Sequence, residues 1–142
     1  MSGYLGSFQH QIDEKGRLSL PAQFRRESGD QTLVLVHVHA NALTLFPEST
    51  WVEMEKRLRE AMRSSPQARA QALRVTANAV EVVPDKQGRI LVPQRMQDAV
   101  GIDGATLVVG VIDRIELWNP ERFAETTTAA APDETFTHQI FA

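Results

Sequence analysis

Short runs of alternating apolar and polar residues fill two stretches of the chain, and the same series of elements is predicted in each. Both stretches begin with two runs that have the two-residue period of half-buried strands. A proline then opens a short helical segment, at residues 21–28 and again at 93–100, and a glycine ends it. Two further apolar runs close each stretch. The predicted strands are residues 6–12, 17–20, 32–38 and 43–46 in the first stretch and 80–84, 89–92, 106–112 and 115–118 in the second. The pattern therefore predicts a mainly β protein with helices, made of two β-β-α-β-β units.

The two units are copies of one sequence. The segment Asp13–Pro21 reappears as Asp85–Pro93, at a constant offset of 72 residues. Identical residues at this offset are Asp13/Asp85, Gly16/Gly88, Arg17/Arg89, Pro21/Pro93 and Gly29/Gly101, and apolar matches are Leu18/Ile90, Leu20/Val92, Phe24/Met96 and Leu45/Leu117. So many matches in one register indicate a tandem duplication, which divides the chain into repeat 1 at 7–49 and repeat 2 at 79–122.

Each repeat carries Asp-x-x-Gly between its first two strands, which is typical of a type I turn. Aspartate is preferred at the first position because its side chain accepts hydrogen bonds from turn amides, and glycine at the fourth because it tolerates positive φ. We therefore interpret Asp13, Gly16, Asp85 and Gly88 as turn-forming residues.

A two-helix linker at residues 50–78 is predicted between the repeats. Pro47 opens the first helix, and Ser64-Ser65-Pro66 ends it and starts the second, which extends to about residue 77. The first helix has an apolar stripe of Trp51, Met54, Leu58, Ala61 and Met62, and we expect Trp51, Met54 and Leu58 to serve the core. At the other end of the chain, residues 126–142 are predicted to form a flexible tail: a Thr/Ala-rich tether followed by an unusually apolar segment with Phe136, Ile140 and Phe141.

Composition excludes several classes of site. The chain contains no cysteine, which excludes disulfides, iron–sulfur clusters and cysteine nucleophiles. Its four histidines lack the spacing of a metal site, and we interpret His37 and His39 as half-buried strand residues. No serine or threonine has the partners of a nucleophile, so we expect neither an enzyme nor a cofactor, metal or small-molecule substrate. Residues 1–6 lack the features of a secretory signal and no apolar run approaches about 20 residues, which predicts a cytoplasmic protein without a membrane segment.

The distribution of charge points to a binding function that the net charge of −3 alone would not suggest. Residues 1–78 contain ten Lys/Arg against eight Asp/Glu, whereas residues 79–142 contain five against ten. The basic residues gather around the two turns and the helices that follow them: Lys15, Arg17, Arg25 and Arg26 in repeat 1, and Lys86 and Arg89 in repeat 2. A solvated charged face would explain such a cluster, but a projecting basic turn beside a short ribbon favours contacts with phosphates.

These residues resemble a known family. Residues 6–25, with Asp13-Glu-Lys-Gly-Arg17, closely resemble the first repeat of the bacterial MraZ family, and Asp85-Lys-Gln-Gly-Arg89 resembles its second repeat. The resemblance covers about residues 4–123 and leaves the tail outside. It implies a fold related to AbrB and SpoVT, in which two β-β-α-β-β units interlock into one pseudo-symmetric swapped-hairpin barrel.

The resemblance also implies a function. It is that of a nucleoid-associated transcriptional regulator of the division and cell-wall gene cluster, which binds closely spaced direct repeats of double-stranded DNA upstream of its own operon as a homo-oligomeric ring. By position, Lys15, Arg17 and Arg25 would contact DNA. Gln87 stands where repeat 1 has Lys15, so we expect repeat 1 to contribute more affinity than repeat 2.

Two other classes of protein remain open. One is a toxin-neutralising antitoxin on a similar barrel, with the tail as its toxin-binding segment, although such antitoxins usually carry one repeat per chain. The other is a structural or RNA-associated scaffold.

Overall fold

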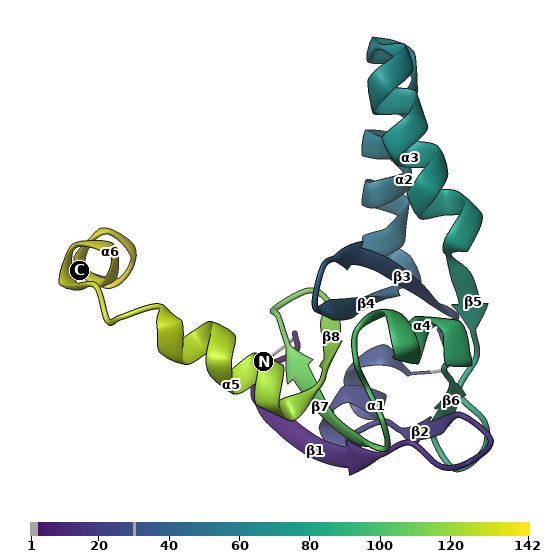
Figure 1. Ribbon diagram of the computed structural model, residues 1–142, viewed down its shortest axis with the longest axis vertical. Helices are drawn as coiled ribbons and strands as arrows, with labels where there is room; N and C mark the ends of the chain where they lie inside the picture. The colour runs from purple at the N-terminus through teal and green to yellow at the C-terminus, as the bar shows by residue number, and fades with distance from the viewer. Residues whose placement is uncertain (1–2, 30) are drawn as a thin grey trace.

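In the computed structural model, which describes residues 3–29 and 31–142, strands and helices follow one another in the order that the repeat predicts (Figure 1). The strands are β1 (Ser7–Gln11), β2 (Arg17–Ser19), β3 (Leu33–His39), β4 (Ala42–Pro47), β5 (Val80–Val82), β6 (Arg89–Leu91), β7 (Ala105–Gly110) and β8 (Ile115–Trp118). The helices are α1 (Ala22–Ser28), α2 (Glu48–Ser64), α3 (Pro66–Asn78), α4 (Gln94–Ala99), α5 (Pro120–Ala129) and α6 (Glu134–Phe141).

The two repeats exchange strands with each other. Six strands form one antiparallel sheet in the order β1-β7-β8-β4-β3-β5, and β2 pairs with β6 in a separate two-stranded ribbon. The first strand of repeat 1 therefore pairs with repeat 2, and β5 of repeat 2 pairs with β3 of repeat 1. The order is unchanged when the two repeats are exchanged, so the sheet has an internal pseudo-twofold relation between β4 and β8.

The expected barrel is the part of the predicted fold that the strand pairing does not confirm. Among the described residues, β1 and β5 each have one neighbour and lie at opposite edges of an open sheet. A mainly β fold with helices, built from two interlocked repeats, is confirmed.

One apolar core serves both repeats. Leu18 of β2 and Ile90 of β6 face each other across the ribbon and are almost fully buried beneath it. Phe24 of α1 is only 1% exposed and lies edge-on to the rings of Tyr4 and Phe8, with ring centroids 5.4 Å apart in both pairs. The buried side chains of Leu18 and Ile90 thus attach the ribbon, which carries both turns, to the core.

The linker forms a helical hairpin that projects from the body of the molecule (Figure 1). Ser65 and Pro66 separate α2 from α3, and the Ser65 hydroxyl accepts a hydrogen bond from the Ala68 amide at 3.0 Å, as a helix cap does. The expectation for the apolar stripe was wrong in part, because no residue of α2 is fully buried. Trp51 and Met54 pack against a second, smaller cluster of Val34, Val36 and Phe46 rather than against the main core.

The tail and the two strand histidines also differ from prediction. Asn119 caps α5 by accepting bonds from the Glu121 and Arg122 amides, and the helix continues through the threonines that were expected to be a flexible tether. Asp133 caps α6 in the same way. His37 and His39 are exposed because the β3–β4 register shifts between Val36 and His39, which takes the end of β3 out of the core.

Within the described residues, no helix is long and apolar enough to cross a bilayer. Met1 and Ser2, part of the segment that was searched for a secretory signal, lie outside those residues.

Candidate nucleic-acid interface

The two Asp-x-x-Gly turns have the same geometry, and in each the aspartate organises the turn. The Gly16 amide donates to the Asp13 carbonyl at 3.0 Å, and the Gly88 amide donates to the Asp85 carbonyl at 2.9 Å. Both glycines have positive φ, +82° and +76°. Asp13 Oδ1 accepts the Lys15 and Arg17 amides, each at 2.9 Å. Both segments therefore have the turn geometry that the Asp-x-x-Gly pattern predicts.

Each aspartate also holds the arginine that begins the next strand. Arg17 Nε donates to Asp13 Oδ2 at 2.8 Å, and Arg89 Nε donates to Asp85 Oδ2 at 2.9 Å. Since these bonds use only Nε, the two Nη groups of each guanidinium remain available as donors toward a ligand. The arginine side chains keep 36% and 28% of their surface exposed. The pairs thus hold two guanidinium groups in fixed orientations.

Arg17 and Arg89 lie on one face of the β2–β6 ribbon. Leu18 and Ile90 pair with each other and point into the core, so their neighbours along both strands point outward. In the register, Arg17 is opposite Leu91 and Ser19 is opposite Arg89, which makes the arginines diagonal neighbours. Residues in such diagonal positions are about 7–8 Å apart, and their Cβ atoms lie somewhat closer than that. The ribbon therefore presents one arginine from each repeat on a common outer face.

The strand exchange places Arg25 at the opposite turn from the one expected. Arg25 Nη1 donates to the Gln87 carbonyl at 3.2 Å, and a Cβ on Gly88 would overlap the Arg25 side chain. The expected cluster of Lys15, Arg17 and Arg25 around one turn is thus wrong in its membership. Helix α1 packs against the turn of repeat 2. The sequence analysis placed Arg25 at the turn nearest to it in sequence and therefore missed this contact.

This crossing reverses the charge balance of the two turns. The first turn has Lys15 and Arg17 against Asp13 and Glu14, so its formal charges cancel. The second turn has Lys86 and Arg89, together with the incoming Arg25, against Asp85 alone. The charges of the two turns therefore no longer support the expectation that repeat 1 contributes more DNA affinity than repeat 2.

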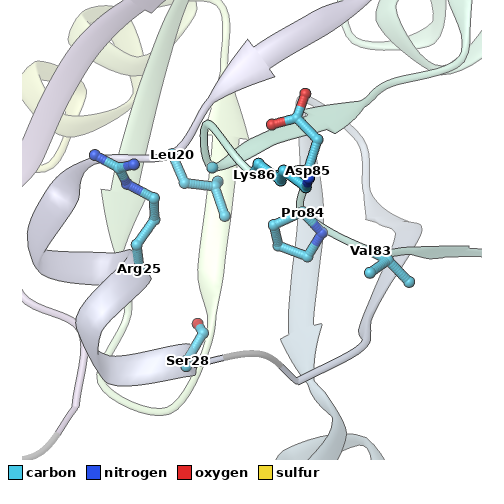
Figure 2. A pocket seen from close by; sticks show the side chains of 9 residues that line it. Leu20, Arg25, Ser28, Val83, Pro84, Asp85 and Lys86 are labelled. Carbon is cyan, nitrogen blue, oxygen red and sulfur yellow. The ribbon is translucent and has the colours of Figure 1, made fainter.

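A pocket of about 350 Å³ lies between α1 and the second turn (Figure 2). Arg25 and Ser28 of α1 line one side, and Val83, Pro84 and Lys86 line the other. Arg25 and Lys86 line it together with the Asp85 carboxylate, so it is a charged hollow beside the ribbon rather than a site for an apolar ligand. Arg26 is exposed on α1, on the same short helix as Arg25.

Gln97 is a site residue that the sequence analysis missed. It occupies in repeat 2 the position of Arg25 in repeat 1, is 5% exposed, and donates from Nε2 to the Val92 carbonyl at 2.9 Å. It also packs beside Gly16, whose carbonyl accepts the Val92 amide at 2.7 Å. The offset of 72 residues from Arg25 was the signal that could have identified it. Gln97 thus supports the first turn without adding charge.

The hydrogen bonds of the turns lower the pKa of both aspartates. The amide of Arg17 has the largest lowering effect on the pKa of Asp13, and the Arg17 guanidinium and the Lys15 amide act in the same direction. The pKa of Asp85 is lowered in the same way by Arg89 and Gln87. Both carboxylates are therefore charged at neutral pH and pair with their arginines there.

We expect a pH-dependent stability difference between the wild type and Asp13→Asn. A carboxyl group whose pKa is lowered by folding stabilises the native state above its unfolded pKa, near 3.8, and this contribution disappears as the pH falls through the lower folded pKa. Urea midpoints should therefore favour the wild type at pH 7 and converge toward the variant near pH 3. A difference that persists unchanged at the lowest pH would show that the carboxylate charge is not its source.

Gly16→Val should destabilise the protein by about 2–4 kcal/mol. The residue has φ of +82°, and a Cβ there would lie 2.9 Å from the Val92 carbonyl oxygen, a backbone atom that cannot move aside cheaply. Chemical denaturation measures the effect. Gly16→Ala and Gly29→Ala form a matched pair, because Gly29 also has positive φ but a Cβ there would meet nothing within 4 Å. Equal losses at the two positions would contradict the crowding at the turn.

The described residues contain no group of His, Asp and Glu side chains that could hold a metal ion.

The family model described as "MraZ protein, putative antitoxin-like" matches the chain twice, over residues 4–74 and 75–139. The chain belongs to the MraZ family. The match continues past residue 123, where the resemblance was expected to end, and includes most of the tail at residues 126–142.

Several curated MraZ proteins are similar to this chain over most of its length. The protein named "Transcriptional regulator MraZ" from Thermomicrobium roseum is 40% identical over 85% of this chain and 84% of its own. The protein of the same name from Desulforamulus reducens is 39% identical over 84% of this chain and 84% of its own. The one from Leuconostoc mesenteroides is 32% identical over 92% of this chain and 90% of its own. MraZ is a family of transcriptional regulators rather than enzymes, as the sequence predicted.

Proposed function

We propose that this protein is a DNA-binding transcriptional regulator whose β2–β6 ribbon contacts double-stranded DNA. The main support is that the ribbon presents two guanidinium groups, those of Arg17 and Arg89, on one outer face. Each is held by a hydrogen bond to the aspartate of its own turn. The names of the relatives, all transcriptional regulators, support this assignment.

The chemistry of the ribbon suits DNA. A two-stranded ribbon fits the major groove, where arginine donates two hydrogen bonds to guanine, and arginine makes equally good bidentate contacts with phosphates. Prior fixation of a long side chain reduces the entropy that is lost on binding. The free Nη groups of Arg17 and Arg89 would make these contacts, and Lys15, Arg25, Arg26 and Lys86 would meet phosphates on either side.

The more specific parts of the proposal follow from the family resemblance. The DNA would consist of closely spaced direct repeats upstream of the protein's own operon, within the division and cell-wall gene cluster, and the protein would act in the cytoplasm at the nucleoid. A homo-oligomeric ring would bring one ribbon to each repeat. Linking several weak contacts in this way raises affinity by about 10²–10⁴-fold.

A footprint of the purified protein on the region upstream of its gene tests this function. We expect protection at regularly spaced short repeats, with affinity that falls steeply as salt rises. The control is a fragment of equal length and base composition in which the repeats are scrambled. Equal binding to both fragments at moderate salt would contradict a sequence-specific regulator, and failure to bind either would contradict DNA binding altogether.

A further inference from the structure

The α2–α3 hairpin carries an apolar groove at its base. The groove encloses about 290 Å³ and is lined by Val38 of β3, by Trp51, Met54 and Leu58 of α2, and by Val75 of α3, with Arg57 among the lining side chains. Val38 is 44% exposed there. We call this feature the hairpin groove. An open apolar surface of this kind is typical of a contact site for another protein segment.

The same chain carries a helix with an exposed apolar face. In α6, Phe136, Ile140 and Phe141 are 57%, 59% and 79% exposed. Phe136 and Ile140 are four residues apart and so lie on one helical face. Asp133 caps the helix, and with Glu134 it makes the first turn acidic. Helix α6 is thus a defined amphipathic element with an unpartnered face.

We propose that α6 of one subunit packs into the hairpin groove of a second copy of the chain. The apolar face of α6 matches the apolar lining of the groove. The charges are complementary as well, because Asp133 and Glu134 are acidic, whereas Arg57 is the charged residue that lines the groove. The inference rests on the homo-oligomer of the proposed function and names the surfaces that form it.

The arrangement of α5 favours a second copy over the same chain as the source of α6. Phe123 of α5 packs edge-on against Trp118 with ring centroids 5.4 Å apart, which fixes the start of α5 to its own subunit. From there α5 leads α6 away from the hairpin, which lies at the other side of the molecule (Figure 1).

The internal repeat supports this interpretation. Phe46 and Trp51 stand at the corresponding positions in repeat 1, at the same offset of 72 residues, and their rings are 5.6 Å apart. Helix α2 therefore starts as α5 does, but α3 folds back beside it, whereas α6 does not fold back beside α5. One subunit offers one groove and one projecting helix, which is a head-to-tail contact able to close a ring.

Substitutions at exposed positions test the contact without disturbing the fold. Phe136→Asp with Ile140→Asp alters α6, and Val38→Glu alters the groove. Val52→Glu is the matched control, because Val52 of α2 is also 44% exposed but does not line the groove. By light scattering at micromolar concentration, we expect a large oligomer for the wild type and for Val52→Glu, and the mass of a single chain for the other two variants.

Mixing the two disrupted variants provides the sharper test. Each retains one intact surface, so the mixture should form a heterodimer of one chain of each kind and nothing larger. Unchanged masses for the α6 and Val38→Glu variants would overturn this inference and leave the ring standing. A wild type that remains a single chain would overturn both, and a heterodimer absent from the mixture would show that α6 and the groove do not meet. Affinity for a fragment with one DNA repeat should be equal in all variants, so a defect in the ribbon would be recognised separately.

Discussion

The double replacement of Arg17→Ala and Arg89→Ala is expected to lower DNA affinity by about 30-fold or more. An arginine that contacts a base or a phosphate contributes about 1–3 kcal/mol, and the two contacts lie on one ribbon face. If both meet phosphates, the slope of log affinity against log salt should fall by about two. Fluorescence titration at several salt concentrations measures both quantities.

The matched control for this experiment is Arg69→Ala, since Arg69 is an exposed arginine on α3, away from the ribbon. It should bind DNA as the wild type does. A double variant that is folded and binds DNA with wild-type affinity would refute the assignment of the ribbon.

The single variants compare the two turns. With Arg25 located at the second turn, the charge comparison now favours a loss for Arg89→Ala that is at least as large as the loss for Arg17→Ala. Lys86→Ala should add a smaller loss that vanishes at high salt, as a single phosphate contact would. A clearly larger loss of DNA affinity for Arg17→Ala would contradict this comparison and support the sequence-based expectation that repeat 1 contributes more.

Phe24→Ala should lower the free energy of unfolding by about 3–5 kcal/mol, the range for large-to-small changes at buried aromatic positions. The ring contacts Tyr4 and Phe8 edge-on and anchors α1, which carries Arg25 to the second turn. Urea denaturation gives the change in unfolding free energy.

Two further variants serve as controls, one for the loss of the aromatic ring without the full loss of volume and one for a truncation at an exposed site. Phe24→Leu keeps most of the apolar volume and should lose about 1–2 kcal/mol. Leu5→Ala, at a residue that is 51% exposed, should lose under about 1 kcal/mol. A similar loss for Phe24→Ala and Leu5→Ala would mean that Phe24 is not a core residue.

Local features of this fold were predictable because they depend on nearby residues. The aspartate and glycine of each turn, the proline before each short helix and the alternation of the strands act over a few positions, and the structure confirms them. The tail was predicted wrongly, since its threonines suggested a loop. The cap from Asn119 and the proline after it were enough to start a helix that runs through them.

The exchange between repeats could not be predicted, because it is a choice between distant partners. A strand such as β1 has the same alternation whether it pairs with its own repeat or with β7. For the same reason, Arg25 was assigned to the turn nearest in sequence. Its contact with Gln87 spans 62 residues and exists only because α1 is carried across to repeat 2.

The exchange of strands has a consequence for synthesis on the ribosome. The first strand cannot complete its pairing until β7, which ends at Gly110, has left the exit tunnel. Until then β1 has no partner strand, and β2 has none until β6 has emerged, because both pair with strands of repeat 2 over long separations in sequence. Truncated products that end within repeat 2 should therefore be recognised by chaperones and proteases, and only the nearly finished chain should escape them.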